Sequence, residues 1–568
     1  MGASIGLVAA IERLVRGRQA MSKLLQLGVY LDNEVISEGD IAAASVLVDI
    51  ARRTGPTEPS DLAWVAMCLA LRTSRDGHTC VDFNRIQEWG ASLTVDDHQY
   101  FPVSSTPWLD ALASVPLLVG AASERKAFIL DGQRLYLGRS FSQEQSIAAV
   151  LTRNSASNIN VLLGGPGTGK TTEVARRLIE RFEQGGVMPR LALAAPTGKA
   201  ATRMTEVLHA RCKDQNASPE VVAAVTAVAA RTIHSLLGYA PNRTPRFTFG
   251  AHNPLPYDLV VIDEASMLSS SDMFQLLEAL APTTELLLVG DPDQLASVES
   301  GSVLADIAAS ANNPQSLLAS RIKVLQTQHR FAADSSIAAL ATAVRNGDTS
   351  SAFNVLEANN TDLRWVDPKN PDQLQMLIDE VYQHALGLCE SAVNVDAAEV
   401  LEKQRMLQVL CAHRGGEMGV FGWNDRINGL LGSKAATTWY AGMPVMVSRN
   451  NPALNLSNGD VGVVLGAKSG DRVHAVFGQS GQYNTIPTSR LEDVSTVHAL
   501  TIHKSQGSEY VHAVVVLPEN NSRILTRELL YTGVTRAIGK LTIVGTRSTI
   551  QSAIERPIRR ASGLATRL

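Results

Sequence analysis

The sequence predicts an α/β protein in which two units with parallel sheets follow one another along the chain. Short, uniformly apolar runs such as VLLGG (161–165) and LALAA (191–195) end in Gly, Pro or an acidic residue, as buried parallel strands do. Amphipathic helical stretches lie between them, and similar apolar runs return at 406–413, 512–518 and 541–546. Because parallel strands need helical crossovers, two α/β units in series are the simplest interpretation.

Residues 1–110 predict a helical N-terminal domain. This part is rich in Ala and Leu at helical spacing, as in DLAWVAMCLALRT (61–73). It contains neither a Gly-rich loop nor a catalytic cluster. We expect it to dock a partner or to pack against the rest of the chain, with a plain structural module as the alternative.

Residues 439–495 predict a small β-barrel inserted within the second α/β unit. NGDVGVVLG (458–466) and DRVHAVFG (471–478) are short strand-like runs separated by turns that contain Gly and Asn. The domains expected from these patterns are therefore 1–110, 111–335 and 336–568, the last with the insertion.

Composition excludes several classes of protein. The chain has 568 residues, of which 45% are hydrophobic and 19% charged, a balance typical of two to four soluble globular domains. A net charge of −4 argues against coating nucleic acid by bulk charge, although it leaves room for a locally basic groove. Five cysteines without a C-x-x-C pair make structural disulfides, zinc and iron–sulfur sites unexpected and predict a cytoplasmic location. No apolar run approaches the roughly 20 residues that span a bilayer.

A phosphate-binding loop is the strongest single motif. GGPGTGKTT matches G-x-x-x-x-G-K-[ST], follows an apolar run and opens a helical stretch. Backbone N–H groups of such a loop wrap phosphates, and the helix N-terminus adds a favourable dipole. We expect Lys170 to neutralise the β- and γ-phosphates and the Thr171 hydroxyl to hold Mg²⁺. The residues expected to bind nucleotide here are Gly164, Gly165, Pro166, Gly167, Thr168, Gly169, Lys170, Thr171 and Thr172.

An acidic pair follows the next strongly apolar strand. LVVIDEASM places Asp263 and Glu264 at a strand end. We expect Asp263 to hold Mg²⁺ through its coordination shell and Glu264 to polarise the attacking water. A pair that merely caps the strand is the alternative, and the complete phosphate loop argues against it. The sequence therefore predicts ATP hydrolysis with Mg²⁺.

Further polar residues indicate a nucleotide held between two lobes. Gln145 precedes the phosphate loop by about twenty residues and can contact N6 and N7 of adenine. Asp291 and Gln294 follow the next strand and suit recognition of the γ-phosphate. Arg330 and Arg536 are candidates for phosphoryl transfer, in which an aimed arginine contributes about 10³–10⁵ in rate. Surface salt bridging is the alternative for each arginine.

The ordered motifs resemble those of superfamily 1B DNA helicases, and more closely the family of RecD, or alpha, subunits of exodeoxyribonuclease V. The motifs are GGPGTGKTT, APTGKAA, VVIDEASM, LLVGDPDQLASVESG, QHRF, TIHKSQGSE and YTGVTRA, with LYLGRS, NPALNLSNGDVGVV and the tail RPIRRASGLA. The resemblance runs from about residue 35 to the end. It implies two RecA-like P-loop lobes, an SH3-like insertion and a small hairpin near 239–254.

The resemblance also implies a DNA path across both lobes. The residues expected to contact the DNA strand are Thr197, Lys199, Thr232, His234, Thr501 and His503. In the motif TIHKSQGSE, Gly507 and Glu509 would approach the nucleotide instead, so that one segment touches both ligands. A satisfied histidine at a helix start is the alternative for His234. The β-barrel at 439–495 would clamp the strand or dock a protein.

As a whole, the resemblance implies an ATP-dependent 5′→3′ single-strand DNA translocase and helicase. It would be the motor subunit of a RecBCD-type helicase–nuclease, acting with RecB-like and RecC-like subunits on double-strand DNA ends in recombinational repair. The polarity rests on the family alone. A free-standing RecD-like helicase is the main alternative, and it is disfavoured by the short N-terminal region. A regulatory ATPase that does not unwind, or a nuclease, is disfavoured by the full set of catalytic positions and by the lack of a separate carboxylate–lysine cluster.

Overall fold

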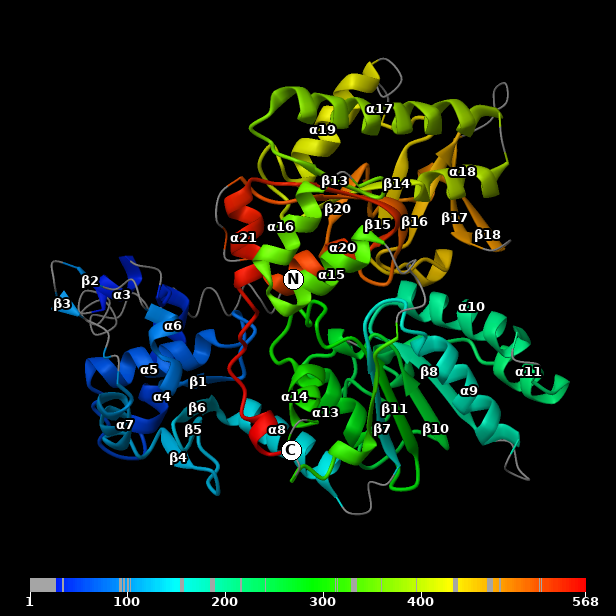
Figure 1. Cartoon of the computed structure of the whole chain (residues 1–568). Helices are drawn as coiled ribbons and strands as arrows, with labels where there is room; N and C mark the ends of the chain where they lie inside the picture. Colours follow the sequence, from blue (N-terminus) through cyan, green and yellow to red (C-terminus); the bar gives the residue numbers. More distant parts are fainter. Residues whose placement is uncertain are drawn as a thin grey trace.

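The computed structural model describes residues 27–568, with gaps. The gaps are 33–34, 91–93, 96–97, 100–101, 103, 154–157, 184–188, 215–216, 241, 312, 314, 328–334, 359, 395, 433–437, 467–472, 480–481, 520–521 and 523. Figure 1 places an N-terminal unit beside two stacked α/β lobes, which we call lobe 1 and lobe 2 in chain order. Lobe 1 lies below lobe 2 in that view.

The N-terminal unit combines helices with a sheet. Its helices are α3 (Gly28–Asp32), α4 (Glu38–Arg52), α5 (Asp61–Arg72), α6 (Gln87–Gly90) and α7 (Thr106–Ala113). Its strands are β1 (Cys80–Asp82), β2 (Thr94–Val95), β3 (His98–Gln99), β4 (Val119–Ala121), β5 (Phe128–Asp131) and β6 (Arg134–Leu137). The expected helices are present, but the four-stranded sheet β1-β6-β5-β4 was not expected. Its strands have only three or four residues, too few for a periodic pattern to emerge from the sequence.

Lobe 1 is built on a six-stranded parallel sheet, as the apolar runs predict. In spatial order its strands are β12 (Ile322–Leu325), β7 (Ile159–Gly164), β11 (Glu285–Gly290), β10 (Leu259–Ile262), β8 (Leu191–Ala195) and β9 (Arg231–Thr232). Its helices are α8 (Gly138–Thr152), α9 (Lys170–Glu183), α10 (Gly198–Asp214), α11 (Pro219–Thr226), α12 (Ile233–Leu236), α13 (Ser270–Glu278) and α14 (Val303–Ser310). Both faces are covered, because Val161 and Leu163 enter one apolar cluster while Leu162 enters another.

Lobe 2 repeats the design with a five-stranded parallel sheet. In spatial order its strands are β13 (Leu363–Val366), β22 (Ala537–Val544), β21 (Tyr510–Val516), β14 (Leu407–Cys411) and β20 (Ala499–Thr501). Its helices are α15 (Ser336–Asn346), α16 (Thr349–Glu357), α17 (Pro371–Asn394), α18 (Ala397–Arg405), α19 (Val420–Leu431), α20 (Arg527–Val534) and α21 (Arg547–Glu555). The prediction of two parallel-sheet units in series is therefore confirmed.

The insertion in lobe 2 is a five-stranded antiparallel sheet with its own small apolar cluster. Its spatial order is β18 (Gln482–Pro487), β17 (His474–Gln479), β16 (Val461–Leu465), β15 (Pro444–Val447) and β19 (Val494–Thr496). We refer to it below as the insertion sheet.

The described part of 239–254 contains turns and one isolated antiparallel bridge between Gly250 and Asn253, and no strand of the expected hairpin. Pro245 cannot donate a ladder hydrogen bond, and Phe247 and Phe249 pack against the lobe 1 core.

The C-terminal tail leaves lobe 2 and ends in lobe 1. After α21 it crosses beside the N-terminal unit and finishes near α8 (Figure 1). Leu564 and Leu568 are buried in the lobe 1 core. Arg567 pairs at 2.7 Å with the fully buried carboxylate of Glu144 on α8, which also accepts from the Gly563 backbone N–H at 3.2 Å. The tail therefore ties the end of the chain to the helix that carries Gln145.

The structure also bears on the cysteines and on apolar helices. All five cysteines are free and buried. In the part of the chain that the structure describes, no helix has the length and apolar character needed to cross a membrane.

Candidate active site between the two lobes

The phosphate-binding loop joins β7 to α9 in lobe 1. Gly167 and Gly169 have φ of 75° and 79°, a left-handed backbone that favours glycine. The Thr168 hydroxyl donates to the Gly165 carbonyl at 2.8 Å and closes the turn. The Lys170 ammonium donates to the carbonyls of Gly164 (2.6 Å) and Gly165 (2.9 Å). The Lys170 side chain is therefore held over the phosphate loop, at the N-terminus of α9, where we expect the phosphates to bind.

Asp263 and Glu264 follow β10, two strands away from β7 in the same parallel sheet. The Asp263 backbone N–H donates to the Ala194 carbonyl at 2.9 Å. Glu264 has a left-handed φ of 51°, and its N–H donates to the Asp263 carboxylate at 2.8 Å. Burial, and then the charge of Glu264, raise the pKa of Asp263 to about 6, while Lys170 and Arg203 oppose that rise. The acidic pair therefore lies within electrostatic reach of the phosphate-loop lysine.

Arg536 of lobe 2 reaches the polar loop that follows β11. Its buried guanidinium donates to the Gln294 side-chain oxygen (3.3 Å) and to the Ser508 carbonyl (3.2 Å). Nearby, the Gln506 amide donates to the Leu295 carbonyl at 2.9 Å. Gln294, expected to recognise the γ-phosphate, and Arg536, expected to assist phosphoryl transfer, are thus in direct contact although they come from different lobes.

Tyr531 on α20 is a site residue that sequence reasoning missed. Its hydroxyl donates to the Asp291 carboxylate at 3.2 Å, and that carboxylate also accepts from the Gln294 amide at 3.1 Å. A Cβ atom on Gly165 would lie 2.9 Å from the Tyr531 oxygen, so lobe 2 packs directly on the phosphate loop. Burial raises the pKa of Asp291. The only available signal was the position of Tyr531 five residues before Arg536 in the same motif.

Other expected nucleotide-binding residues are less informative. Gln145 is exposed on α8 and lines neither of the two cavities described below. Thr171 and Thr172 are half-buried in the first turn of α9. Arg330 lies in the gap 328–334, outside the described residues. Its predicted role therefore stays a prediction.

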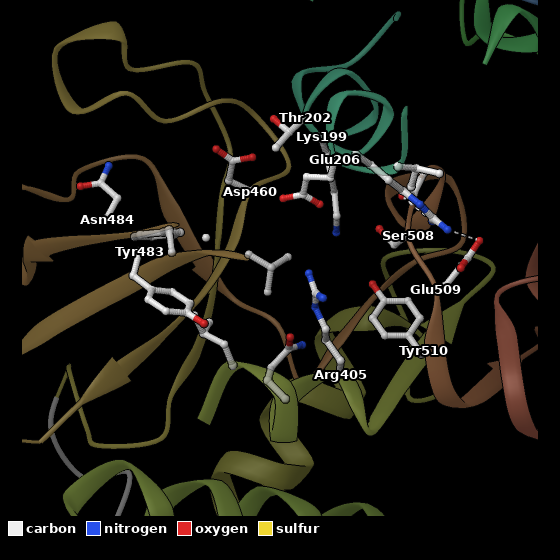
Figure 2. A pocket seen from close by; sticks show the side chains of 18 of the residues that line it. Lys199, Thr202, Glu206, Arg405, Asp460, Tyr483, Asn484, Ser508, Glu509 and Tyr510 are labelled. Carbon is white, nitrogen blue, oxygen red and sulfur yellow. Dashed lines mark hydrogen bonds and ion pairs between the residues drawn. The ribbon is translucent and has the colours of Figure 1, made fainter. Parts of the chain in front are cut away.

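An interlobe cavity of about 620 Å³ lies between α10, α18, β21 and the insertion sheet (Figure 2). Lys199, Gly507 and Glu509 line it. Arg203 on α10 donates to the Gly507 carbonyl at 3.1 Å and forms an ion pair with Glu509, which joins the two lobes at the cavity wall. Burial, and then the positive charge of Arg405, lower the pKa of Lys199 to about 8.

Residues of the segment 501–510 line two different cavities. His503 lines a second cavity, of about 900 Å³, between the N-terminal unit, the loop 295–298 and the C-terminal tail. Burial, and then Arg560, lower the pKa of His503. Gly507 and Glu509 face the interlobe cavity, which they share with Lys199. The lysine expected on the DNA path therefore lies with residues expected near the nucleotide.

The remaining expected DNA contacts are polar groups at element ends. The hydroxyls of Thr197, Thr232 and Thr501 accept from backbone N–H groups three residues onward, at 3.2, 3.2 and 3.3 Å. An accepting hydroxyl keeps its own hydrogen for donation, for instance to a phosphate oxygen. His234 is half exposed, with its ring 5.2 Å from Tyr239 and its Nε2 4.0 Å from Asp272. The structure does not bring these four residues into one cavity with Lys199.

The oxygen donors fit a magnesium ion that arrives with a nucleotide. Mg²⁺ commonly uses one or two protein oxygens and completes its shell with phosphates and water. Thr171 and Asp263 supply such oxygens in lobe 1. Among the described residues, no group of three or more His, Cys, Asp or Glu side chains could hold a metal by itself.

Comparison with known proteins covers almost the whole chain. Residues 32–136 match the family model "RecBCD enzyme subunit RecD, N-terminal domain", residues 140–366 match an AAA domain, and residues 496–544 match a UvrD-like helicase C-terminal domain. The chain is 39% identical to the RecBCD enzyme subunit RecD of Mycolicibacterium smegmatis, over 94% of this chain and 98% of that protein. It is 37% identical to the RecD subunit of Mycobacterium tuberculosis, over 94% and 95%. The ATP-dependent RecD2 DNA helicase of Deinococcus radiodurans is 30% identical, over 74% of this chain but 51% of that protein.

Proposed function

Because the chain belongs to the family of RecD subunits of the RecBCD enzyme, we propose that it is the ATP-dependent 5′→3′ DNA motor of a RecBCD-type complex. The complex would contain RecB-like and RecC-like subunits and would process double-strand DNA ends for recombinational repair. The observation that carries the motor assignment is the contact of Arg536 in lobe 2 with Gln294 in lobe 1, beside the phosphate loop. The identity of 39% to a RecD subunit, against 30% to the Deinococcus helicase, and the match of residues 32–136 to the RecD N-terminal domain model favour a subunit over a free-standing helicase.

Each lobe would contribute a different part of ATP hydrolysis. The phosphate loop and Lys170 bind the β- and γ-phosphates, and Glu264 accepts the proton of the attacking water as ADP leaves. Gln294 and Arg536 stabilise the charge that develops on the γ-phosphoryl oxygens. Thr171 and Asp263 would hold Mg²⁺, which neutralises phosphate charge and orients the nucleotide when bound. Removal of the γ-phosphate takes away the ligand shared by both lobes.

Movement on DNA would follow from that change. Gln506 and Arg203 already connect the segment 501–510 to lobe 1. Opening and closing of the lobes would alternate the grip on DNA of Thr197, Lys199, Thr232 and His234 in lobe 1 with that of Thr501 and His503 in lobe 2. We further propose that the insertion sheet is an SH3-like clamp over the strand and that the N-terminal unit docks a partner subunit.

A strand-displacement assay tests the proposed function. The protein, purified from its own cells with associated subunits, is given duplexes with a 5′ or a 3′ overhang, with and without ATP. To separate the activity of this chain from that of any associated subunit, the assay is repeated with a complex carrying Lys170→Ala. We expect unwinding that requires a 5′ overhang, ATP and Lys170. A Lys170-dependent preference for the 3′ overhang would contradict the polarity, and purification without large partners would support the free-standing alternative.

A further inference from the structure

Two cations face each other across the interlobe cavity. Lys199 extends from α10 of lobe 1, and Arg405 ends α18 of lobe 2, and Figure 2 shows their charged groups pointing toward one another. Among the described residues, neither side chain ends in an ion pair or a hydrogen bond. Like charges held together in a half-buried space repel each other unless an anion lies between them.

Two buried hydroxyls lie close to each other on the same wall. Ser508 and Tyr510 line the cavity and are only 5% and 3% exposed. Neither side-chain oxygen makes a hydrogen bond of normal geometry within the described structure, although the Ser508 hydroxyl is close enough to lower the pKa of Tyr510. Leaving a buried polar group without a hydrogen bond is costly, so such groups commonly mark a site for a polar ligand.

We propose that the interlobe cavity binds one backbone phosphate of single-stranded DNA, held by Lys199 from lobe 1 and by Arg405, Ser508 and Tyr510 from lobe 2. The inference rests on the proposed function and adds Arg405, Ser508 and Tyr510 to the DNA contacts implied by family resemblance. Two cations and two hydroxyls can satisfy the oxygens of one phosphodiester.

The acidic residues of the cavity favour a phosphodiester over a nucleotide. Glu206, Asp460 and Glu509 line the cavity alongside Lys199, Arg203 and Arg405. Glu509 is paired with Arg203, and Asp460 accepts from the Ser457 backbone N–H at 2.7 Å. Burial raises the pKa of both Glu206 and Asp460, while Arg405 opposes the rise in Glu206 and Lys199 the rise in Asp460, so the two acids partly balance these cations. A space with balanced charges accommodates the single negative charge of a backbone phosphate better than the several charges of a triphosphate.

The position of the cavity also favours DNA. No residue of the phosphate loop lines it, whereas Tyr483 of the insertion sheet does, with 38% of its surface exposed. An exposed aromatic ring beside a phosphate site is a platform on which a base can stack. A volume of about 620 Å³ lies within the range of sites that enclose small ligands.

The backbone of this wall is shared with the ATP site. The Ser508 carbonyl accepts from Arg536, which contacts Gln294, while the Ser508 side chain faces the cavity. A shift of Arg536 with the state of the γ-phosphate would therefore move a DNA ligand directly. The proposed phosphate site would be tight only in one arrangement of the lobes.

Arg405→Ala tests the proposal in the full-length protein. Binding of a fluorescent oligo-dT is measured by anisotropy over a range of salt, and binding of mant-ADP by fluorescence. Removing one charged contact should weaken oligo-dT binding about tenfold. It should also lower the salt slope by about 0.7, the value for one phosphate on a single strand. Affinity for mant-ADP should stay unchanged.

Lys403→Ala is the matched control, since Lys403 lies on the same helix, outside the cavity, and donates to Ser391 at 2.8 Å. It should leave both affinities as in the wild type. In Lys199→Ala/Arg405→Ala, the loss should be smaller than the sum of the single losses, because both side chains hold one phosphate.

Three outcomes would overturn the proposal. They are an Arg405→Ala protein that binds oligo-dT like the control, fully additive losses in the double variant, or a loss of mant-ADP binding alone, which would assign the cavity to the nucleotide. A wild-type protein that binds neither ligand would instead contradict the proposed function, so the two failures are distinguishable.

Discussion

Lobe 1 and lobe 2 are both built on parallel sheets, yet they bring opposite kinds of groups to the ATP site. Lobe 1 carries the phosphate loop and the carboxylates Asp263 and Glu264. Lobe 2 has no phosphate loop among its described residues. It supplies Tyr531 from α20 and Arg536 from the turn just after that helix. We therefore expect lobe 1 alone to bind the nucleotide and hydrolysis to require lobe 2.

Within lobe 2, polar groups near the ATP site differ in how completely they are satisfied. The Arg536 guanidinium donates to three acceptors of lobe 2, on Thr532, Ser508 and Thr535, and to the Gln294 side chain of lobe 1. The buried hydroxyls of Ser508 and Tyr510 make no hydrogen bond of normal geometry in the described structure. The groups around Arg536 thus complete the contact between the lobes, whereas the two hydroxyls retain hydrogen-bonding capacity for a ligand.

Lys170→Ala tests the lobe 1 half of the comparison and should have the largest effect. Without the ammonium that neutralises the phosphates, the protein should lose both mant-ATP binding and DNA-stimulated ATP turnover. The fold should survive, because the Lys170 side chain contacts only loop carbonyls among the described residues. Circular dichroism provides the control, and turnover equal to the wild type would refute the assignment of this loop.

Arg536→Ala tests the lobe 2 half. Turnover should fall by about 10³, the lower end for an arginine that stabilises phosphoryl transfer, while ADP affinity changes little. Steady-state kinetics and mant-ADP titration separate the two quantities. Because Arg536 is buried and also holds the Ser508 carbonyl, Arg536→Lys serves as a second variant that keeps a charge in place. If both variants lost ADP binding together with turnover, lobe 2 would also be needed to bind the nucleotide. The proposed difference between the lobes would then be wrong.

Arg567→Ala tests whether the C-terminal tail, which follows lobe 2 but folds into lobe 1, stabilises lobe 1. The substitution leaves the fully buried Glu144 carboxylate without its cation. Breaking a buried pair in this way costs about 3 kcal/mol, which should lower the temperature of unfolding and expose the tail to proteases. Arg559→Ala removes an exposed pair with Glu88 and should change stability by less than about 1 kcal/mol. Equal stability of the Arg567→Ala and Arg559→Ala proteins would contradict a stabilising role for the Arg567–Glu144 pair.

Acidic pH should weaken the part of the ATP site that lobe 1 supplies. The pKa of Asp263 is raised to about 6, so below that pH its carboxyl gains a proton and loses the charge needed to hold Mg²⁺. Affinity for Mg·ATP should therefore fall about tenfold per pH unit below about 6 and reach a plateau above it. Titration of Mg²⁺ into the mant-ATP complex measures the effect. In Asp263→Asn, only the pH dependence of the nucleotide's own phosphate, whose second pKa is about 6, should remain.

How well the sequence predicted a feature depended on how far apart along the chain the residues of that feature lie. The phosphate loop is a continuous segment whose glycines and lysine act within nine residues, so its geometry is local. Gln294 and Arg536 were predicted separately from their motifs, and their contact at 3.3 Å joins positions 242 residues apart. Tyr531 begins the motif YTGVTRA and Arg405 lies in no quoted motif. The contacts that define their roles come from the other lobe and the insertion sheet.

The sequence by itself determined the two parallel sheets, the phosphate loop and the family, because apolar runs and ordered motifs encode local structure and chemistry. Tertiary structure alone decided that Lys199 faces Arg405, that the tail of the chain neutralises Glu144, and that His503 and Glu509 lie on opposite sides of one segment. These relations depend on how the lobes pack. Side-chain distances across such an interface follow from the global arrangement of the sheets and not from the spacing of residues along the chain.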